Sequence, residues 1–183
     1  MSVELSYTPD ALALAVLLHP HPDFGGDQLH PFIDGLFRRL DESGIGAVRF
    51  DFSSAEPAEA KAQTIAAIKA GLDRWGTVPV VLAGYSFGAG IAATVEDKRV
   101  VAWYLLAPQV SFLTGSMIGR SARPKRIVVP ELDRYSSPDS VRKATSDWTS
   151  TTVDTLPDTT HFLGDIRPIV DSAASWIESV LHA

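Results

Sequence analysis

The sequence predicts a three-layer α/β/α sandwich around one twisted, mostly parallel sheet of six or seven strands. Short apolar segments rich in β-branched residues alternate with longer segments of helical period, which is typical of parallel strands joined by helices. Four of the apolar segments are hydrophobic almost without interruption, as strands covered on both faces must be. With 183 residues and 45% hydrophobic content, the chain can bury one substantial core, so we expect a single domain over residues 1–183.

The strands are predicted from these apolar segments in chain order. The first long one, ALALAVLL at residues 11–18, is too short to cross a bilayer, and no Lys or Arg precedes it as in a signal peptide. A buried strand is therefore the better interpretation, with a possible edge strand before it at 3–5. The main strands are predicted at residues 13–19, 46–52, 78–84, 100–107, 126–132 and 150–156.

Helices are predicted where apolar residues recur three and four positions apart. The first of these segments also has a proline near its start and a glycine just past its end, where helices tolerate them. The helices are predicted at residues 28–42, 57–75 and 164–182. Residues 109–124 have no clear period, and we expect a loop or short helix over one end of the sheet, with its apolar side chains shielding one wall of a site.

Charge and composition exclude several classes of function. The net charge is −6 and no run of Lys or Arg could follow a phosphate backbone, so nucleic acid is not an expected partner. The chain has no cysteine, which excludes disulfides, thiolate zinc sites and a cysteine nucleophile. Without a targeting or anchoring segment, we expect a cytoplasmic protein with no membrane partner. No feature of the sequence indicates an oligomeric state.

The segment VVLAGYSFGAGIAA, residues 80–93, contains the motif GxSxG at Gly84, Ser86 and Gly88. An apolar strand enters the motif and a helix of small residues leaves it, as around a nucleophilic serine on a tight strand-to-helix turn. The residues two before and two after such a serine must lack bulk, because strand and helix nearly touch there. The free N–H groups at the helix start stabilise negative charge. This setting predicts that Ser86 is a nucleophile, and an ordinary turn serine is the alternative.

A serine hydroxyl needs a base to take its proton. His161, in DTTHFLGD, lies between the last strand and the last helix, at the carboxyl edge of the sheet where open α/β folds bind ligands. It is the predicted base. The other four histidines fit less well, because His182 is at the terminus, His30 is expected on the solvent side of a helix start, and His19 and His21 end the first long strand.

The group that orients the base is predicted among the aspartates between the serine and the histidine. Asp133 directly follows the strand at 126–132 and is the main candidate. Asp139 lies further on, in the first turn of the next helix, where the helix dipole alone explains a carboxylate. Asp158 is close to His161 in sequence and is either a supporting group or a turn residue.

The order Ser86, Asp133, His161 on an alternating α/β chain is that of the α/β-hydrolase fold. The chain resembles the small, lid-less bacterial α/β-hydrolases related to dienelactone hydrolase, which have an HPHPxxGG turn after the first core strand. The segments that match, in order, are VLLHPHPDFGGD, AGYSFGAG, YLLAPQV, PELDRYSSP and DTTHFLGD. They span nearly the whole chain, and the resemblance implies this fold without a cap domain.

The chain departs from these relatives in two respects. Residues 49–60, RFDFSSAEPAEA, replace an Arg-Gly pair and a glycine-rich loop that commonly borders the active site in the family. The true dienelactone hydrolases use a cysteine nucleophile, whereas this chain has a serine and no cysteine. The resemblance therefore does not imply dienelactone hydrolysis.

A serine hydrolase also needs two N–H donors for the oxyanion of its tetrahedral intermediate. Phe87, the residue after the nucleophile, is expected to supply one. The second is expected from the turn HPHPDFGG, whose prolines have no N–H, which leaves His21, Asp23 and Phe24. The resemblance matches the family's His-Gly pair to the start of this turn and so points to His21.

The sequence thus predicts a serine hydrolase without cofactor or metal, which cleaves a small ester or related acyl bond through an acyl-enzyme. Its expected partner is a small-molecule acyl substrate, with Phe24 and Tyr85 as the expected contacts. The rings of Tyr85 and Phe87 flank the serine, and each is either a wall of the acyl pocket or part of the core. Three alternatives remain: a non-catalytic ligand-binding protein on the same fold, an acyltransferase or peptidase with the same residues, and a metal site at His19 and His21. These two histidines face the same side of an extended strand but lack further ligands at a recognisable spacing.

Overall fold

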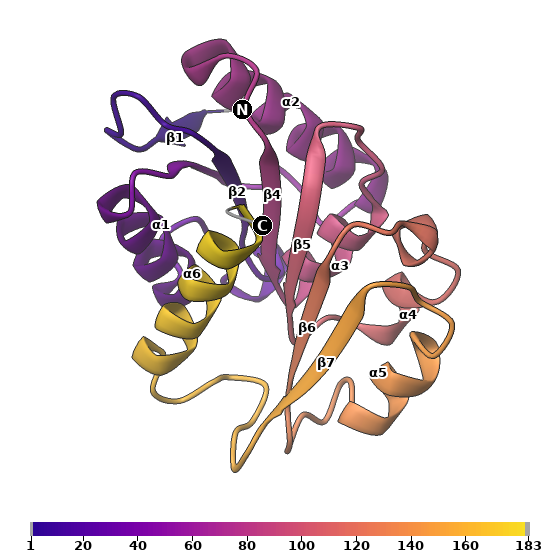
Figure 1. Cartoon of the computed structure of the whole chain (residues 1–183). Coiled ribbons are helices and arrows are strands. Elements are labelled where there is room, and N and C mark those ends of the chain that lie inside the picture. Colours follow the sequence, from indigo (N-terminus) through magenta and orange to yellow (C-terminus); the bar gives the residue numbers. More distant parts are fainter. Residues whose placement is uncertain (1, 182–183) are drawn as a thin grey trace.

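The computed structural model describes residues 2–181 and has one seven-stranded sheet between two layers of helices (Figure 1). The strand order is β1-β3-β2-β4-β5-β6-β7; β1 pairs antiparallel with β3, and all other neighbours are parallel. The strands are β1 (Val3–Leu5), β2 (Leu14–Leu18), β3 (Gly46–Phe50), β4 (Val80–Tyr85), β5 (Val100–Leu106), β6 (Lys125–Pro130) and β7 (Thr151–Leu156). The helices are α1 (Pro31–Glu42), α2 (Pro57–Trp75), α3 (Phe87–Thr94), α4 (Val110–Leu113), α5 (Pro138–Ala144) and α6 (Arg167–Leu181), with short 3-10 helices η1 (Pro22–Phe24) and η2 (Met117–Arg120). The predicted fold class is confirmed.

Helices cover both faces of the sheet. In β2, Leu14, Val16 and Leu18 belong to the core cluster under α2 and α3, whereas Ala15 and Leu17 belong to the cluster under α1 and α6. Because successive strand side chains point to opposite faces, burial on both sides requires an uninterrupted apolar strand. None of the helices in residues 2–181 combines the length and the hydropathy needed to cross a membrane.

Most predicted boundaries agree with the structure to within a few residues. Helix α1 begins at Pro31 rather than at 28, because the proline suits the first helical position and the His30 ring caps the helix by accepting the N–H of Phe32 at 3.3 Å. Helix α6 begins at Arg167, later than predicted, and position 182 of the predicted helix lies outside the described residues.

The segment between β5 and β6 forms α4 and η2, which lie against α3. Leu113 and Ile118 are buried, and the Phe112 ring packs so closely on Gly90 that a Cβ there would lie 2.6 Å from a ring carbon. Most apolar side chains of this segment therefore complete the core, whereas Met117 is 46% exposed. Within residues 2–181, no cap domain is inserted between these strands, as expected.

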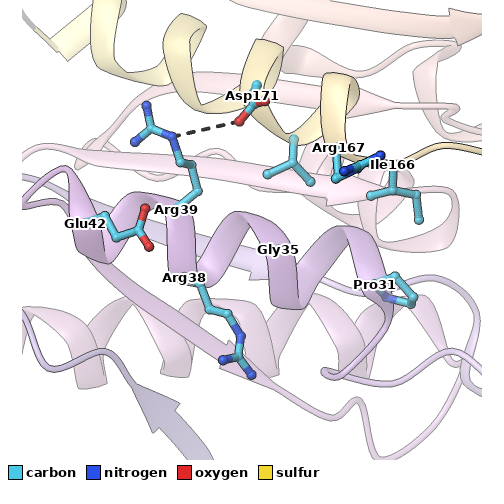
Figure 2. Close-up of a pocket in the computed structure, with 9 residues that line it drawn as sticks. Pro31, Gly35, Arg38, Arg39, Glu42, Ile166, Arg167 and Asp171 are labelled. Atoms are coloured by element: carbon cyan, nitrogen blue, oxygen red, sulfur yellow. Dashed lines mark ion pairs between the residues drawn. The ribbon is translucent and has the colours of Figure 1, made fainter.

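Helices α1 and α6 lie side by side on one face of the sheet and leave a surface groove between them (Figure 2). The helices approach closely at Gly35, where a Cβ would lie 3.0 Å from Val170. The groove has a volume of about 310 Å³ and its charged side chains are of both signs; Arg39, for example, lies 4.0 Å from Asp171. None of the predicted site residues lines this groove.

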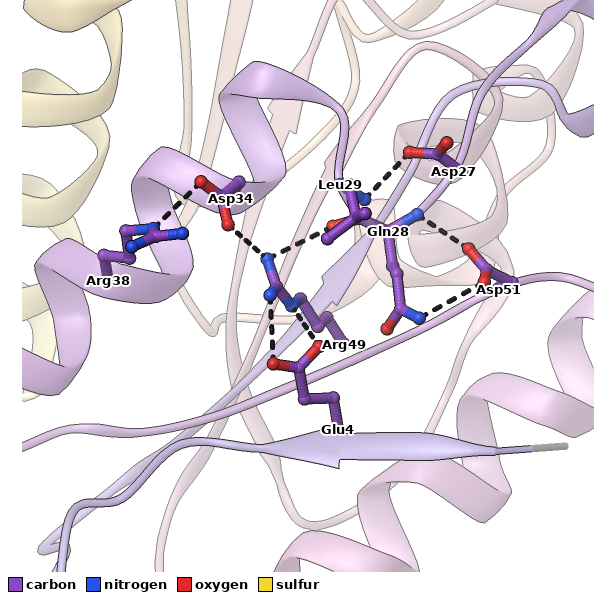
Figure 3. A network of polar contacts seen from close by, with 8 residues as sticks. All are labelled: Glu4, Asp27, Gln28, Leu29, Asp34, Arg38, Arg49 and Asp51. Carbon is purple, nitrogen blue, oxygen red and sulfur yellow. Dashed lines mark hydrogen bonds and ion pairs between the residues drawn. The ribbon is translucent and has the colours of Figure 1, made fainter.

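A buried arginine joins the edge of the sheet to α1 (Figure 3). Arg49 of β3 donates to both carboxylate oxygens of Glu4 in β1, at 2.9 and 3.0 Å, and to Asp34 of α1 at 2.7 Å. Its guanidinium also stacks over the Phe37 ring, 4.2 Å from the centroid. Bidentate pairing and stacking suit arginine better than lysine, because the guanidinium is planar and carries a fork of donors.

Next to this network, Asp51 holds the segment that precedes α1. Its carboxylate accepts hydrogen bonds from the backbone N–H of Gln28 at 2.7 Å and from the side-chain amide of the same residue at 3.2 Å (Figure 3). Arg49 reaches the carbonyl of Gln28 as well, at 3.5 Å. The end of β3 therefore positions residues 27–30, which connect the turn after β2 to α1.

We expect Arg49→Met to lower the free energy of unfolding by about 3 kcal/mol, because it leaves Glu4 and Asp34 without their shared cation. The matched control is Arg38→Met, which removes a more exposed ion pair with the same Asp34 and should change stability by no more than about 0.5 kcal/mol. Urea titration followed by circular dichroism measures both. Equal effects of the two substitutions would contradict the assigned role of Arg49.

Candidate active site

Ser86 lies on the turn between β4 and α3, in a strained conformation with a positive φ of 54° and ψ −113°. The turn is tight on both sides, because a Cβ at Gly84 would lie 2.5 Å from the backbone nitrogen of Ala89, and one at Gly88 only 2.1 Å from the carbonyl oxygen of Leu18. This is the steric requirement that the motif predicted. The backbone strain at Ser86 holds its side chain at the carboxyl edge of the sheet.

The three predicted polar side chains meet at this edge. Ser86 Oγ lies 3.0 Å from Nε2 of His161, and Nδ1 of the same ring lies 2.7 Å from Oδ2 of Asp133. An ionised carboxylate can only accept, so Nδ1 carries the proton and Nε2 is free to accept the hydroxyl proton of Ser86. Ser86 and Asp133 are buried, whereas the histidine is partly accessible from the site.

Asp133 is held in its ionised form by its own loop. Burial raises the pKa of Asp133, but hydrogen bonds from His161 and from the N–H groups of Tyr135 and Ser136 outweigh it and lower the pKa below its usual value. The two N–H groups lie 2.8 and 3.1 Å from Oδ1. The other oxygen, Oδ2, is thus free to accept the hydrogen bond from Nδ1 of His161.

The two alternative aspartates have other partners. Asp139 is in the first turn of α5, as predicted, where it pairs with Arg142 at 3.4 Å on the exposed side of the helix. Asp158 lies in a turn with φ 51°, and its N–H donates to Glu131 at 2.9 Å. Of the three candidates, Asp133 is the one whose carboxylate is hydrogen-bonded to His161.

Tyr85 supports the histidine from below. Its hydroxyl donates to the backbone carbonyl of His161 at 2.5 Å, and its side chain is almost wholly buried. Burial, with a smaller contribution from Asp133, raises the pKa of Tyr85, so its hydroxyl stays protonated as a donor. Sequence reasoning assigned Tyr85 to the substrate and missed this bond, which joins two residues far apart in the chain.

The first predicted oxyanion donor, the N–H of Phe87, opens helix α3 and has no acceptor within the helix. The Phe87 ring does not form a wall of the site. It is buried and packs edge-on against Phe52 and Phe112, with centroid distances of 5.4 and 6.1 Å. Of the two interpretations of this ring, the structure favours core.

The turn after β2 was predicted to supply the second N–H donor to the oxyanion, and the structure leaves two of the three candidates. The N–H of Phe24 is already bonded to the carbonyl of His21 at 3.2 Å, which leaves the N–H groups of His21 and Asp23. The chain folds back tightly here, since a Cβ at Gly26 would lie 2.2 Å from the carbonyl oxygen of Pro20. The His21 ring packs between Phe24 and Phe87, so the turn sits directly beside the start of α3.

His19 clamps this turn to the end of β3. Its Nε2 accepts the N–H of Phe52 at 2.9 Å, and its Nδ1 donates to the carbonyl of Pro20 at 2.6 Å. Burial lowers the pKa of His19 and keeps the ring neutral. Both ring nitrogens have protein partners, and no cluster of three or more metal-ligating side chains occurs in residues 2–181. The metal interpretation of His19 and His21 therefore has no structural support.

His30 differs from its predicted placement on the solvent side. Its Nδ1 caps α1 and its ring packs against Tyr85, 5.0 Å between centroids, so that it lines the pocket above Ser86. Burial lowers the pKa of His30. With Nδ1 accepting from Phe32, the neutral ring carries its proton on Nε2. No local sequence signal indicates this position, which depends on how α1 packs against β4.

A pocket of about 310 Å³ opens above Ser86. It is lined by both predicted substrate contacts, Phe24 and Tyr85, and by ten other residues. None of these twelve lining residues is Asp, Glu, Lys or Arg. The lining residues are Pro20, His21, Phe24, Gly25, Gly26, His30, Tyr85, Ser86, Gln109, Tyr135, His161 and Phe162. Tyr135 and Phe162 were missed, although their places beside Asp133 and His161 in the sequence could have indicated them.

Two expected walls of the site lie elsewhere. From residues 109–124 only Gln109 lines the pocket, because Phe112, Leu113 and Ile118 pack into the core and Met117 is exposed away from the pocket. The unusual loop at 53–60 does not line it either. The hydroxyls of Ser53 and Ser54 bond to Glu59 at 2.6 and 2.7 Å, which folds this loop onto the start of α2.

Comparison with known protein families gives a match over part of the chain. The model of the family "Bacterial virulence protein (VirJ)" matches residues 39–101, a segment that includes Ser86 but not Asp133 or His161. A search of curated proteins finds no match.

Solved structures show the fold clearly. An α/β-hydrolase-fold protein of Agrobacterium tumefaciens has a TM-score of 0.88 at 21% identity, over 98% of this chain and 91% of that one. A lid-less α/β serine hydrolase of Xanthomonas campestris has a TM-score of 0.81 at 22% identity, over 99% and 88%. A dienelactone hydrolase of Anabaena variabilis has a TM-score of 0.77 at 15% identity, over 98% and 91%. The chain therefore has the α/β-hydrolase fold, and no lid domain is inserted within residues 2–181.

We expect the free energy of unfolding to decrease as the pH is lowered from about 7 to about 5, partly because of His19. Its pKa is lowered in the folded state, so above the ordinary value of about 6.5 the ring is neutral whether the chain is folded or not. Below that value the unfolded chain binds a proton that the folded protein does not. His19→Gln should give a shallower decline of the urea-unfolding free energy over this range, with a residual slope from His30. Identical slopes would show that His19 is not buried and neutral.

Proposed function

We propose that this protein is a serine hydrolase that cleaves a small ester or related acyl bond through an acyl-enzyme. The observation that supports it best is the unbroken chain of hydrogen bonds from Ser86 through His161 to the ionised Asp133. The lid-less serine hydrolase fold of its structural neighbours adds to this support. Geometry of this kind converts a weakly nucleophilic hydroxyl into an effective nucleophile.

In the acylation step, Ser86 Oγ attacks the carbonyl carbon of the substrate while its proton passes to Nε2 of His161. The carbonyl π electrons move to oxygen, and the resulting oxyanion is bound by the N–H of Phe87 and, in this proposal, that of His21. The positive end of the α3 dipole lies at the same place and favours the negative charge. Asp133 stabilises the imidazolium through Nδ1 and keeps the ring in orientation.

The intermediate then collapses. The bond between the carbonyl carbon and the leaving oxygen breaks, and the imidazolium returns its proton from Nε2 to the departing alcohol. Water repeats the sequence on the acyl-enzyme, with His161 as the base, and releases the acid and free Ser86. Apart from the substrate and one water molecule, each step uses only side chains and backbone groups of this chain.

The first test is covalent labelling with a fluorophosphonate probe. We expect the folded protein to form a phosphonyl adduct on Ser86, located by mass spectrometry, because such probes react with a serine activated by a neighbouring base. The Ser86→Ala variant and the urea-unfolded wild type should remain unlabelled. An absent adduct, or an adduct on another serine, would reject the proposed mechanism and favour a ligand-binding protein on this fold.

A second test separates Asp133 from Asp139. We expect Asp133→Asn to lower kcat for p-nitrophenyl acetate by about ten-thousand-fold, because an amide favours the wrong tautomer and leaves the imidazolium unsupported. Asp139→Asn, on the exposed face of α5, is the matched control and should leave kcat near that of the wild type. Circular dichroism checks that both variants fold. A large loss of kcat in Asp139→Asn, together with a nearly unchanged kcat in Asp133→Asn, would overturn the assignment of Asp133 as the orienting carboxylate.

A further inference from the structure

We propose that the ester cleaved at this site is uncharged and carries an aromatic ring, which binds against the side chains of Phe24, Tyr135 and Phe162. This inference rests on the proposed function, and it specifies the class of substrate. It is drawn from three features of the pocket: its exposed aromatic rim, the rings that line its floor, and the absence of charged residues from its walls.

The rim consists of aromatic side chains that are unusually exposed. Phe24 is 86% exposed, Tyr135 67% and Phe162 76%, and each comes from a different loop at the carboxyl edge of the sheet. Among residues 2–181, the one other aromatic side chain exposed to this degree is Tyr7, which is 93% exposed and does not line the pocket. Large rings gathered in water around a single site are typical of a binding surface.

The floor of the pocket adds further rings. Tyr85 and His30 lie 5.0 Å apart by their centroids, and Tyr135 meets His161 edge-on at 4.8 Å. Aromatic rings attract one another in edge-to-face and offset arrangements, because the negative face of one meets the positive edge of another. A substrate ring would extend this arrangement, whereas an aliphatic group would gain only from burial of its surface.

The charge of the pocket excludes ionic substrates. Its lining contains no Asp, Glu, Lys or Arg, so a substrate carboxylate would meet no cation in place of lost water. Asp133 is nearby, but its carboxylate is completely buried behind His161 and hydrogen-bonded to its own loop, so a substrate ammonium group does not reach it. The overall charge of −6 further disfavours the approach of anions. The neutral groups present, such as Gln109, suit hydroxyl or carbonyl groups.

The exposed rim could instead contact a partner protein. The pocket favours a small molecule, because the rings surround a cavity of about 310 Å³ with Ser86 at its floor, a volume within the range of small-molecule sites. The protein-docking interpretation is kept as an outcome of the test.

The test compares esters that differ only in the aromatic character of one ring. In the acyl arm, vinyl hydrocinnamate is compared with vinyl cyclohexanepropanoate; in the alcohol arm, phenethyl butanoate is compared with cyclohexylethyl butanoate. The ring is insulated from the reacting carbonyl in every case, so intrinsic reactivity within a pair is the same. Cyclohexyl is the more apolar ring, so burial alone would favour it. We expect kcat/KM to favour the phenyl ester in at least one arm, by about three- to tenfold.

Leucine substitutions identify the rings responsible. Phe24→Leu, Tyr135→Leu and Phe162→Leu keep an apolar side chain but remove its aromatic face, and together they should bring the phenyl-to-cyclohexyl ratio down towards one. Tyr7→Leu is the matched control, an equally exposed aromatic residue outside the pocket, and should leave the ratio unchanged. Adding a para-carboxylate to the hydrocinnamate ester should lower its kcat/KM.

The outcomes separate this inference from the function on which it rests. A phenyl-to-cyclohexyl ratio of one or less in both arms, in a protein that hydrolyses p-nitrophenyl acetate, overturns the aromatic inference and favours the rim as a protein-docking surface. A ratio that survives all three leucine substitutions overturns the assignment of the rings, and equal turnover of the carboxylated ester overturns the exclusion of charge. Failure to hydrolyse any ester, with no label on Ser86, instead rejects the proposed function.

Discussion

The close approach of α3 to the end of β2 is the constraint on which the rest of the site depends. With the backbone of Gly88 packed against the carbonyl of Leu18, the chain can leave β4 for α3 only through a sharp turn, and Ser86 takes a strained, positive-φ conformation at its apex. The same contact brings the turn after β2 beside the first N–H of α3. One packing constraint thus places both the serine hydroxyl and the groups that face a developing negative charge.

Around this contact, hydrogen bonds fix the loops at the carboxyl edge, in two cases to a neighbouring strand or the residues that follow it. His19 binds the turn after β2 to the end of β3, and Tyr85 at the end of β4 binds the loop of His161. Asp133 is fixed by the N–H groups of its own loop. The reactive groups lie on loops, but the strands determine where those loops stand, which is how a site can be both accessible and rigid.

The sequence predicted what depends on local pattern, and missed what depends on contacts between distant segments. Apolar runs and helical spacing identified the strands and long helices, and the glycines of GxSxG correctly indicated a turn without room for side chains. His30 was placed on the wrong side, because its position depends on packing between α1 and β4. The segment after β5 was expected over the site, yet its apolar residues pack on α3, a choice that residue type alone does not determine.

Helix α3 also has a consequence for how the chain reaches its native state. From Phe87 to Ala93 every residue is buried, so the helix has no polar face to leave in water. Such a segment gains little as an isolated helix and is stable only once strands on both sides, and α4 above it, are in place. Strands β4 and β5 adjoin α3 in the sequence, but β2 and α2, which also pack on it, are more distant, and distant contacts slow folding. We therefore expect the reactive turn to form together with the centre of the sheet, so that partly folded chains should not display it.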